Sequence, residues 1–496
     1  MGGHRWTRAE RPGPGVCTLT SISSACSTPT IVRAALTGAL RSNSSSGFFR
    51  SNPFGNGYTL AAGLERAVRF IQQLGFTDED LTFLQSGGLF PDPGFLDALA
   101  RFRFTGDIDA VPEGTVVFPH EPLLQVRARI FEAQLLETAV LNMIGYASLV
   151  ATKATRIARA AGDHAVLEFG ARRAHEMDAA LEGARAAVIG GCVGSSYVAA
   201  GARYGLSLAG THAHSWVLSF PSEIEAFRAY AAVYPDNLIL LVDTYDVLAS
   251  GVPNAIRVFR ELRARRGALA RHGIRIDSGD LAHLSKQSRV MLDVAGFQDA
   301  TLVASNELDE AVIAELERQG ARIDAYGVGT RLITGYDQPA FGCVYKLVAV
   351  EENGLWTPRL KRSENAAKVT NPGVKRVLRF TDRRSRRAVL DLIALADEPA
   401  PTQPFLAFDP VHTWKRKNVE GADHADLLAP VLRVESSCTT FRPLTASPIG
   451  PARACGPSMR STPACSTRLV TTWTYRRSCG RRRWRWCARP RAEARR

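Results

Sequence analysis

Two histidines in the middle of the chain have a type and spacing that could do chemistry. His212 and His214 follow the apolar run 206–209, and because they are two residues apart they share a face on extended backbone. A metal site, a buried hydrogen-bonded histidine and a nucleophile that accepts a phosphoryl group all fit this pattern. A metal site needs further histidines at later strand ends, whereas His272 precedes its predicted strand and His283 falls in a predicted helix. The local pattern therefore favours the buried histidine.

Paired carboxylates follow the next two apolar runs. Asp243 and Asp246 end the segment LLVDTYD, and Asp277 and Asp280 end the segment RIDSGD. On adjacent strand ends, carboxylates can hold Mg²⁺, ribose hydroxyls or a developing positive charge. Helix N-capping is the alternative, and it accounts for Asp280 but not for both pairs.

An aromatic residue and two arginines follow the run 165–169, in the segment FGARR. The ring of Phe169 could stack on a flat anionic ring, and Arg172 could bind a carboxylate through two hydrogen bonds. A core phenylalanine beside a surface pair of arginines is an equally good interpretation of this segment alone.

A glycine-rich turn, YGVGTR, begins at Tyr326. Gly327 and Gly329 let backbone N–H groups approach an anion, and Thr330 adds a hydroxyl donor. A plain tight turn is the alternative, but phosphate sites of barrels lie after strands seven and eight, where this turn falls. Together these groups indicate a site that joins a small acidic ring to a sugar phosphate.

Short apolar runs that alternate with helical segments must position these groups. Between residues 165 and 328 we predict seven buried strands that end in polar residues. They are 165–169, 186–189, 206–209, 238–242, 274–276, 302–304 and 325–328. Repeated strand–helix units require a parallel sheet covered by helices, and their density favours an irregular (β/α) barrel over an open Rossmann sheet.

The segments on both sides of the barrel predict a second domain in this α/β protein, of the α+β sandwich-like kind. Strands are expected near 123–128, 377–380 and 388–395, and a long helix near 133–161 with an interruption at Gly145. The predicted organisation is irregular chain over 1–45, the N-terminal part of the α+β domain over 46–132, the catalytic barrel over 133–345, the C-terminal part of the α+β domain over 346–435 and a basic, disordered tail over 436–496.

The formal charge of +14 is concentrated at one end of the 496-residue chain. Residues 436–496 hold fourteen arginines, no lysine and one acid, so residues 1–435 are nearly neutral. We therefore expect no nucleic-acid partner, except non-specifically through the tail, and an RNA-binding remnant is an alternative class. Because neither a run of eighteen apolar residues nor a secretory pattern occurs, we expect a cytoplasmic protein without a membrane partner.

Eight segments, in order, resemble those of the nicotinate phosphoribosyltransferases, a family of type II phosphoribosyltransferases. They are NPFGNGYTLAAGLE (52–65), EAQLLET (132–138), EFGARR (168–173), GTHAHSW (210–216), LLVDTYD (240–246), RIDSGDL (275–281), SNELDE (305–310) and YGVGTRLITGYDQPAFGCVYKL (326–347). The resemblance covers residues 48–434, and the number of segments makes it specific although each is modest alone.

The resemblance implies an ATP-dependent enzyme of NAD biosynthesis. The family joins nicotinate to phosphoribosyl pyrophosphate, which gives nicotinate mononucleotide and pyrophosphate, and ATP drives the reaction through a phosphohistidine. By resemblance the phosphohistidine is His214, while Asp243 and Asp277 serve the ribose and the Mg²⁺-pyrophosphate. The implied partners are these small molecules and a second copy in a homodimer with the site at the subunit interface. Mg²⁺ is the implied cofactor, with no protein ligand assigned and no tightly bound organic cofactor.

The resemblance also assigns the binding residues. Phe169 stacks on the pyridine ring, and Arg275, with Thr211 and Arg172, holds the nicotinate carboxylate. Nicotinamide-using relatives place an acid at the position of Ser196, and its absence here favours the acid substrate. The residues that cradle the phosphate are Gly327, Gly329 and Thr330.

Both ends of the chain depart from the family pattern. A segment of the type D-x-Y-x-L-T-M does not occur in residues 1–45, and the resemblance stops after Glu435. An out-of-frame reading at both ends is one hypothesis for this change. The alternatives are a nicotinamide or quinolinate phosphoribosyltransferase, a catalytically impaired remnant, and a metal-dependent barrel hydrolase.

Overall fold

The computed structural model describes residues 42–87, 93–361, 363–364, 368–409, 412–435, 438–441 and 472–474. The chain divides into two compact units. The larger consists of Met1–Val374 with Leu427–Leu469, and the smaller of Lys375–Asp426 with Val470–Arg496.

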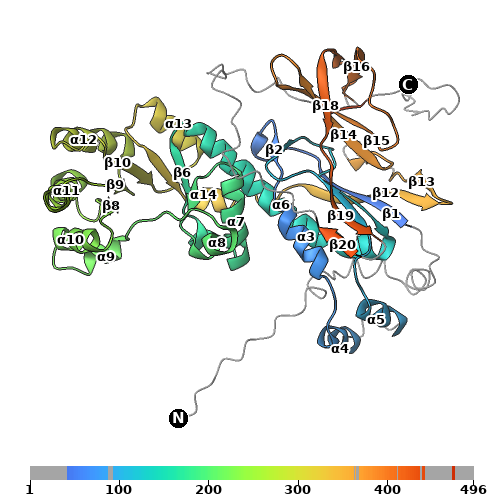
Figure 1. The fold of residues 1–496 in the computed structure, drawn as a ribbon, viewed down its shortest axis with the longest axis horizontal. Helices are drawn as coiled ribbons and strands as arrows, with labels where there is room; N and C mark the ends of the chain where they lie inside the picture. Colours follow the sequence, from blue (N-terminus) through green and yellow to red (C-terminus); the bar gives the residue numbers. More distant parts are fainter. Residues whose placement is uncertain are drawn as a thin grey trace, which may run out of the picture. The chain divides into compact units, whose positions relative to one another are not determined.

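Six strands of the larger unit form a parallel sheet in the order β7-β6-β11-β10-β9-β8 (Figure 1). Their bounds are β6 Ala165–Glu168, β7 Gly194–Ser195, β8 Asn237–Leu241, β9 Arg271–Ile276, β10 Thr301–Ser305 and β11 Ala325–Val328. Five of the seven predicted strands are confirmed, since β6, β8, β9, β10 and β11 overlap them. Strands β8, β10 and β11 are buried along nearly their whole length, with Leu240 and Ile239 in separate apolar clusters, as in a sheet buried on both faces.

Two predicted strands are wrong, and the closed barrel is not seen. Residues 186–189 are the last turn of helix α7 (Met177–Ile189), because an alanine-rich segment favours helix and a four-residue apolar run does not distinguish the two. The run 206–209 adds a single bridge, between Leu208 and Ser195 of β7. Among the described residues the sheet is an open half-barrel.

Helices fill the connections between these strands, as predicted. Figure 1 shows α10, α11 and α12 beside strands β8 to β10, which they contact. The helices of this region are α8 Val198–Tyr204, α9 His214–Leu218, α10 Glu223–Val233, α11 Val252–Arg266, α12 Leu281–Val294, α13 Glu310–Arg318 and α14 Thr330–Ile333. Their apolar faces and the sheet enclose one core that includes Phe227, Phe259 and Tyr326.

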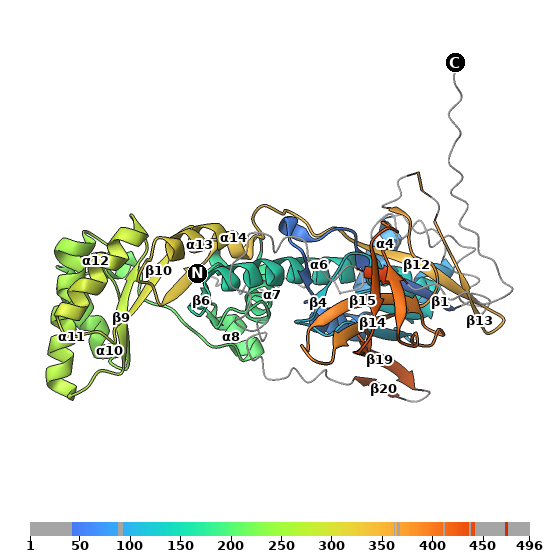
Figure 2. The same ribbon diagram turned by 90° about the horizontal axis from the view of Figure 1, so that it is seen from above.

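Helix α6 (Ile130–Ala160) links this sheet to a second one in the same unit (Figure 2). It contacts β6 of the parallel sheet as well as β1, β5 and β12 of the antiparallel sheet. The predicted interruption at Gly145 is wrong, since the helix runs through it. By length and composition α6 could cross a membrane, but 67% of its most apolar stretch is buried inside the molecule, as in a core helix.

The second sheet combines strands from before and after the parallel sheet. It has seven strands in the order β13-β12-β1-β5-β3-β19-β20. Their bounds are β1 Ser42–Phe49, β3 Asp107–Ala110, β5 Leu124–Arg129, β12 Cys343–Glu352, β13 Leu355–Pro358, β19 Ala429–Glu435 and β20 Cys438–Phe441. The small pair β2 (Thr59–Leu60) and β4 (Val116–Val117) and helices α3 (Leu64–Gln73), α4 (Asp78–Ser86) and α5 (Pro93–Ala100) complete this part. Strand β1 begins inside the segment predicted to be irregular, and β20 lies inside the predicted tail.

The smaller unit is a six-stranded sheet in the order β17-β16-β21-β15-β14-β18. Its strands are β14 Lys375–Asp382, β15 Ala388–Leu395, β16 Phe405–Phe408, β17 Arg416–Val419, β18 Ala422–Asp426 and β21 Thr472–Thr474. Its own core includes Leu378, Phe380 and Leu392, each without solvent exposure.

Candidate active site

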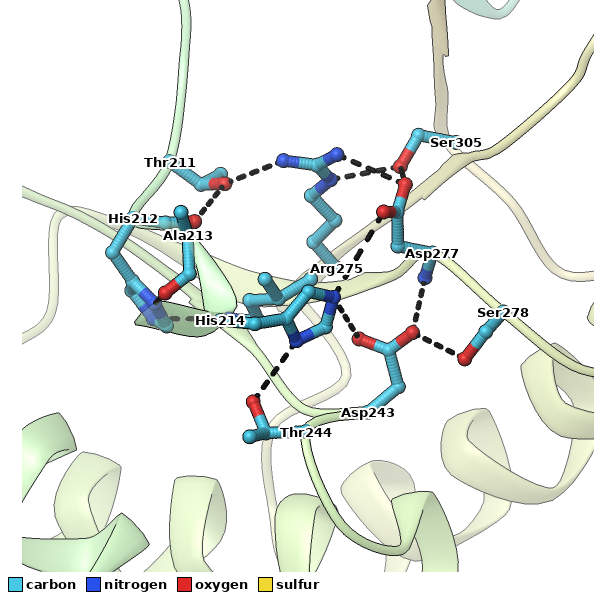
Figure 3. A network of polar contacts seen from close by, with 11 residues as sticks. Thr211, His212, Ala213, His214, Asp243, Thr244, Arg275, Asp277, Ser278 and Ser305 are labelled. Atoms are coloured by element: carbon cyan, nitrogen blue, oxygen red, sulfur yellow. Dashed lines mark hydrogen bonds and ion pairs between the residues drawn. The ribbon is translucent and has the colours of Figure 1, made fainter. Parts of the chain in front are cut away.

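Polar side chains gather where the parallel strands end (Figure 3). Asp243 follows β8 after one residue, Asp277 follows β9 directly, and Ser305 is the last residue of β10. Because the strands are parallel, their carboxyl ends share one edge of the sheet. This edge brings together Thr211, His214, Asp243, Arg275 and Asp277 from the predicted set.

Each of the two aspartates has one oxygen held and one oxygen turned toward His214. Oδ2 of Asp243 accepts from Asp277 N (2.9 Å) and from Ser278 Oγ (2.6 Å). Its Oδ1 is buried with no hydrogen-bond partner among the described residues and lies 3.8 Å from His214 Nε2. Oδ1 of Asp277 accepts from Arg275 (3.0 Å) and Ser305, which leaves Oδ2 at 3.9 Å from His214 Nε2. Two free carboxylate oxygens thus face one imidazole nitrogen.

The other imidazole nitrogen of His214 is held by a hydroxyl. Its Nδ1 lies 3.1 Å from Thr244 Oγ1, and the side chain is 40% exposed. A ring held from one side by a hydroxyl and facing acids on the other has a fixed orientation, with access for a ligand.

His212 has a structural place instead. Its Nε2 accepts from the backbone N–H of Leu241 in β8 (3.1 Å), and its Nδ1 lies 3.4 Å from Ala213 O. The ring therefore connects the segment that follows Leu208 to β8, the edge strand of the parallel sheet. Burial lowers the pKa of His212 to about 4, opposed by the hydrogen bond to Ala213 and aided by the charge of Arg275. Of the three interpretations, the buried hydrogen-bonded histidine holds for His212.

Arg275 lies over the ring of Phe169, although β9 and β6 are separated by two strands. Its Cζ is 5.4 Å from the ring centroid. The two strands between them present Gly327 on β11 and Ser305 on β10 near this path. A Cβ on Gly327 would lie 2.5 Å from two ring atoms of Phe169 and 3.4 Å from Ser305 Cβ. Small residues on the middle strands therefore let the ring and the guanidinium meet.

The guanidinium of Arg275 is oriented by three neighbours. Its Nε donates to Ser305 Oγ (2.8 Å), one terminal nitrogen to Thr211 Oγ1 (2.9 Å) and the other to Asp277 Oδ1 (3.0 Å). An arginine has five N–H donors, so two are left for a ligand carboxylate. Phe169, Thr211 and the adjacent Gly210 also line a small pocket, together with Ile239 of β8 and Val303 of β10.

The turn after β11 brings Gly329 and Thr330 to the same edge. Gly329 precedes the short helix α14, and Thr330 Oγ1 lies 3.4 Å from Glu307 Oε1. Asn306 and Glu307 both have positive φ, which costs energy in residues with a side chain. A carboxylate thus faces the turn predicted to cradle a phosphate.

Arg172 and Ser196 are not part of this cluster. Both are exposed, and Arg172 pairs with no carboxylate within the described part of the chain. They lie on neighbouring loops joined by Glu168, whose fully buried carboxylate accepts from Gly170 N and from Ser195 Oγ (2.5 Å). Burial raises the pKa of Glu168, and these two donors oppose the shift.

Sequence reasoning missed Ser305, Thr244 and Glu168. Ser305 and Glu168 are the last residues of their strands and Thr244 lies three residues after β8, so closeness to the carboxyl end of a strand was the available signal. A larger pocket, lined by His164, Thr301 and Asp324, lies at the amino ends of β10 and β11, away from every predicted site residue.

The fold and the edge of polar groups define an α/β enzyme of the phosphoribosyltransferase class. Residues 40–145, 164–379 and 374–447 match the N-terminal domain, the family and the C-terminal domain of nicotinate phosphoribosyltransferase (NAPRTase), respectively. The chain belongs to the nicotinate phosphoribosyltransferase family. The match to residue 447 corrects the expectation that the resemblance stops after Glu435.

Individual relatives agree with this assignment. The nicotinate phosphoribosyltransferase of Bacillus subtilis (strain 168) is 50% identical over 382 residues, 77% of each chain. That of Mus musculus is 35% identical over 433 residues, which cover 75% of this chain and 78% of the relative. The crystal structure of human Nicotinic Acid Phosphoribosyltransferase superposes with a TM-score of 0.75 at 28% identity, covering 92% of this chain and 97% of the human one.

Proposed function

We propose that this nicotinate phosphoribosyltransferase couples the joining of nicotinate and phosphoribosyl pyrophosphate to ATP hydrolysis through a phosphate on His214. The observation that carries the proposal is the convergence of two free carboxylate oxygens, from Asp243 and Asp277, on one nitrogen of that histidine. The products are nicotinate mononucleotide and pyrophosphate, as the family membership indicates.

The phosphoryl step uses the histidine as a nucleophile. An imidazole nitrogen of His214 bonds to the γ-phosphorus of ATP while the bond to the ADP oxygen breaks, and water later cleaves the N–P bond. The two aspartates stabilise the positive charge that the ring acquires when it is phosphorylated, and Thr244 keeps the ring turned toward them.

The ribosyl step uses the same acids together with Arg275 and Phe169. We infer that the arginine binds the nicotinate carboxylate and that the ring of Phe169 stacks on the pyridine. The pyridine nitrogen attacks C1 of the ribose as pyrophosphate leaves, and the carboxylates stabilise the oxocarbenium-like centre. The turn with Gly327, Gly329 and Thr330 would take the 5-phosphate.

Mg²⁺ fits the free oxygens of Asp243 and Asp277. Hard carboxylate ligands suit this ion, and the buried Oδ1 of Asp243 has no other partner among the described residues. Bound there with a diphosphate, the ion would neutralise the charge of the leaving group. No tightly bound organic cofactor is needed for this chemistry.

The remaining expectations are proposals that follow from the family. We propose a cytoplasmic homodimer whose site lies at the subunit interface, with Arg172 turned toward the substrate in the complete site. Ser196 is uncharged, so this position carries no carboxylate that would repel the carboxylate of nicotinate, which supports nicotinate rather than nicotinamide as the substrate. For the fold, we propose that the half-barrel sheet belongs to an irregular catalytic barrel and that the seven-stranded sheet with α3, α4 and α5 is the second α+β domain.

Substitution of His214 by alanine tests the proposal. Wild-type protein with nicotinate, phosphoribosyl pyrophosphate, Mg²⁺ and ATP should form the mononucleotide, and ATP should raise the rate. His214→Ala should lose that ATP dependence, because no phosphoenzyme forms. The matched control His283→Ala, an exposed histidine on α12, should behave as wild type. Unchanged ATP stimulation in His214→Ala would refute the assigned role.

A further inference from the structure

The hydroxyl of Ser305 lies between Arg275, on the side of Phe169, and Asp277, on the side of His214. It contacts Arg275 Nε at 2.8 Å on one side and Asp277 Oδ1 on the other, and the residue is 3% exposed (Figure 3). We propose that Ser305 is a positioning residue that fixes Arg275 for the nicotinate carboxylate and Asp277 for His214 at the same time. This inference rests on the proposed function of that site.

The direction of the hydrogen bonds through Ser305 is determined by its neighbours. A guanidinium can only donate, so the serine oxygen accepts from Arg275. Its own proton must then point to Asp277, whose ionised carboxylate can only accept. The hydroxyl thus carries the influence of the arginine charge to the aspartate, and both bonds are of the stronger, charge-assisted kind.

This bridge decides which oxygen of Asp277 is free. Oδ1 receives donors from Ser305 and Arg275, so Oδ2 is the oxygen that faces His214 at 3.9 Å. Without the hydroxyl, Oδ1 would lose one of its two donors and the carboxylate could rotate. The guanidinium would lose the bond at Nε, one of the three that orient it beside the ring of Phe169.

A serine also meets the space limits at this position. Ser305 is 3% exposed and its Oγ lies 2.8 Å from Arg275 Nε, while the Cζ of that arginine is 5.4 Å from the ring centroid of Phe169. Ser305 therefore supplies a hydroxyl where a longer polar side chain would block the contact between the arginine and the ring. The consequence is substrate selection, because an acid needs an oriented guanidinium more than a neutral amide does.

The test compares Ser305→Ala with Ser288→Ala in the full-length enzyme. Ser288 is a matched control: it is also buried, lies on α12, and its hydroxyl has no hydrogen-bond partner among the described residues. For each protein we would measure kcat and KM for nicotinate and for nicotinamide, and the Kd of nicotinate. Ser305→Ala should raise the KM and Kd of nicotinate about tenfold and reduce the preference for nicotinate over nicotinamide by a similar factor. Ser288→Ala should change each value less than about twofold.

Three outcomes separate the proposals. Wild-type protein that forms no mononucleotide from nicotinate would refute the proposed function itself. Active wild type together with an unchanged nicotinate preference in Ser305→Ala would refute only the role of Ser305. A fall in kcat for both substrates with the preference kept would also refute it, since a merely structural defect does not distinguish acid from amide.

A second variant covers the case in which alanine disturbs folding. Ser305→Cys keeps the shape of the side chain, with a somewhat larger atom in place of the oxygen, but has only a weak donor and acceptor. It should show the same loss of nicotinate preference at a melting temperature close to wild type. A Ser305→Cys protein with wild-type preference would overturn the proposal.

Discussion

At the scale of single residues, His212 makes the stability of the larger unit sensitive to acid. It accepts a backbone hydrogen bond from Leu241 and its pKa is lowered to about 4 by burial. The unfolded chain binds the proton near pH 6.5, so stability is complete above that pH and is lost as the pH falls toward 4. We expect the loss from this residue to reach about 3 kcal/mol at most.

Urea unfolding at pH 7.5 and pH 5 measures this effect. His212→Gln, which cannot take up the proton, should lose less stability between the two pH values than wild type does. His283→Gln, at an exposed position on α12, should lose as much as wild type. Equal acid sensitivity in His212→Gln would mean that another group is responsible.

Gly327 is the second residue with a specific consequence. An alanine Cβ there would meet two ring atoms of Phe169 at 2.5 Å, so the ring must move from its place under Arg275. Overpacking of this kind costs about 1–3 kcal/mol. We expect Gly327→Ala to raise the KM for nicotinate at least tenfold, as measured by steady-state kinetics.

A neutral glycine substitution provides the comparison. A Cβ at Gly342 would have no heavy atom within 4 Å, so Gly342→Ala should leave the KM unchanged. Equal KM values in the two variants would show that the ring of Phe169 does not take part in binding nicotinate.

The sequence allowed the types of chemistry to be predicted but not all of the geometry. Asp243 and Asp277 were predictable because polar residues follow β-branched and leucine runs, which places them at one edge. The role of Arg275, which lies inside β9, came only from the resemblance to the family. The end of a predicted strand marked Ser305 as a candidate, but its role was not predictable, since it depends on the order of β9 and β10 and on the small residue at Gly327. The different roles of His212 and His214 could not be predicted either. Their spacing fits two ligands of one metal ion equally well as one histidine bonded to the backbone and one nucleophile.

At the scale of elements, helix α6 shows how far a glycine can be judged from sequence. Gly145 was expected to interrupt the helix, but a Cβ there would meet only Phe341 Cβ, at 3.9 Å. Alanine at such a position reduces the entropy of the unfolded chain without a clash. We expect Gly145→Ala to stabilise the protein by about 0.5–1 kcal/mol in urea unfolding.

Another glycine beside α6 should respond with the opposite sign. A Cβ on Gly190, at the end of α7, would lie 2.4 Å from the backbone oxygen of Ala151. Gly190→Ala should therefore destabilise the protein. If Gly145→Ala and Gly190→Ala shift the free energy of unfolding in the same direction, local packing does not determine the effect of an added Cβ.

Element prediction failed where short apolar runs were ambiguous. The run 186–189 is helical because it continues the alanine-rich α7, and 206–209 is too isolated to form more than one bridge. Each of the five correctly predicted strands is followed by a helix, which for β6, β8, β9 and β10 returns the chain so that the next strand runs parallel. The closed barrel was predicted partly from the runs 186–189 and 206–209, and the described strands form a parallel half-barrel sheet.

At the scale of the whole molecule, the division into two units predicts two independent stabilities. Phe380 has no solvent exposure in the core of the smaller unit, with Phe405 at a ring distance of 5.2 Å. Loss of such a ring costs about 3–5 kcal/mol. Calorimetry of Phe380→Ala should show one transition moved to lower temperature and another unchanged.

The affinity for nicotinate provides the second measurement. It should be the same in Phe380→Ala and wild type, because the candidate site lies in the larger unit. Phe83→Ala, at a position 63% exposed on α4, should change neither transition by more than a degree or two. A single shared transition in wild type would contradict the independence of the units.

The position of β3 in the seven-stranded sheet has a consequence for how the protein is made. This strand pairs with β5 on one side and with β19, Ala429–Glu435, on the other. At about 5–20 residues per second, the ribosome needs ~15–60 s to add the roughly 320 residues that separate β3 from β19. During that time the nascent chain carries an open strand edge, a template for aggregation that chaperones must cover.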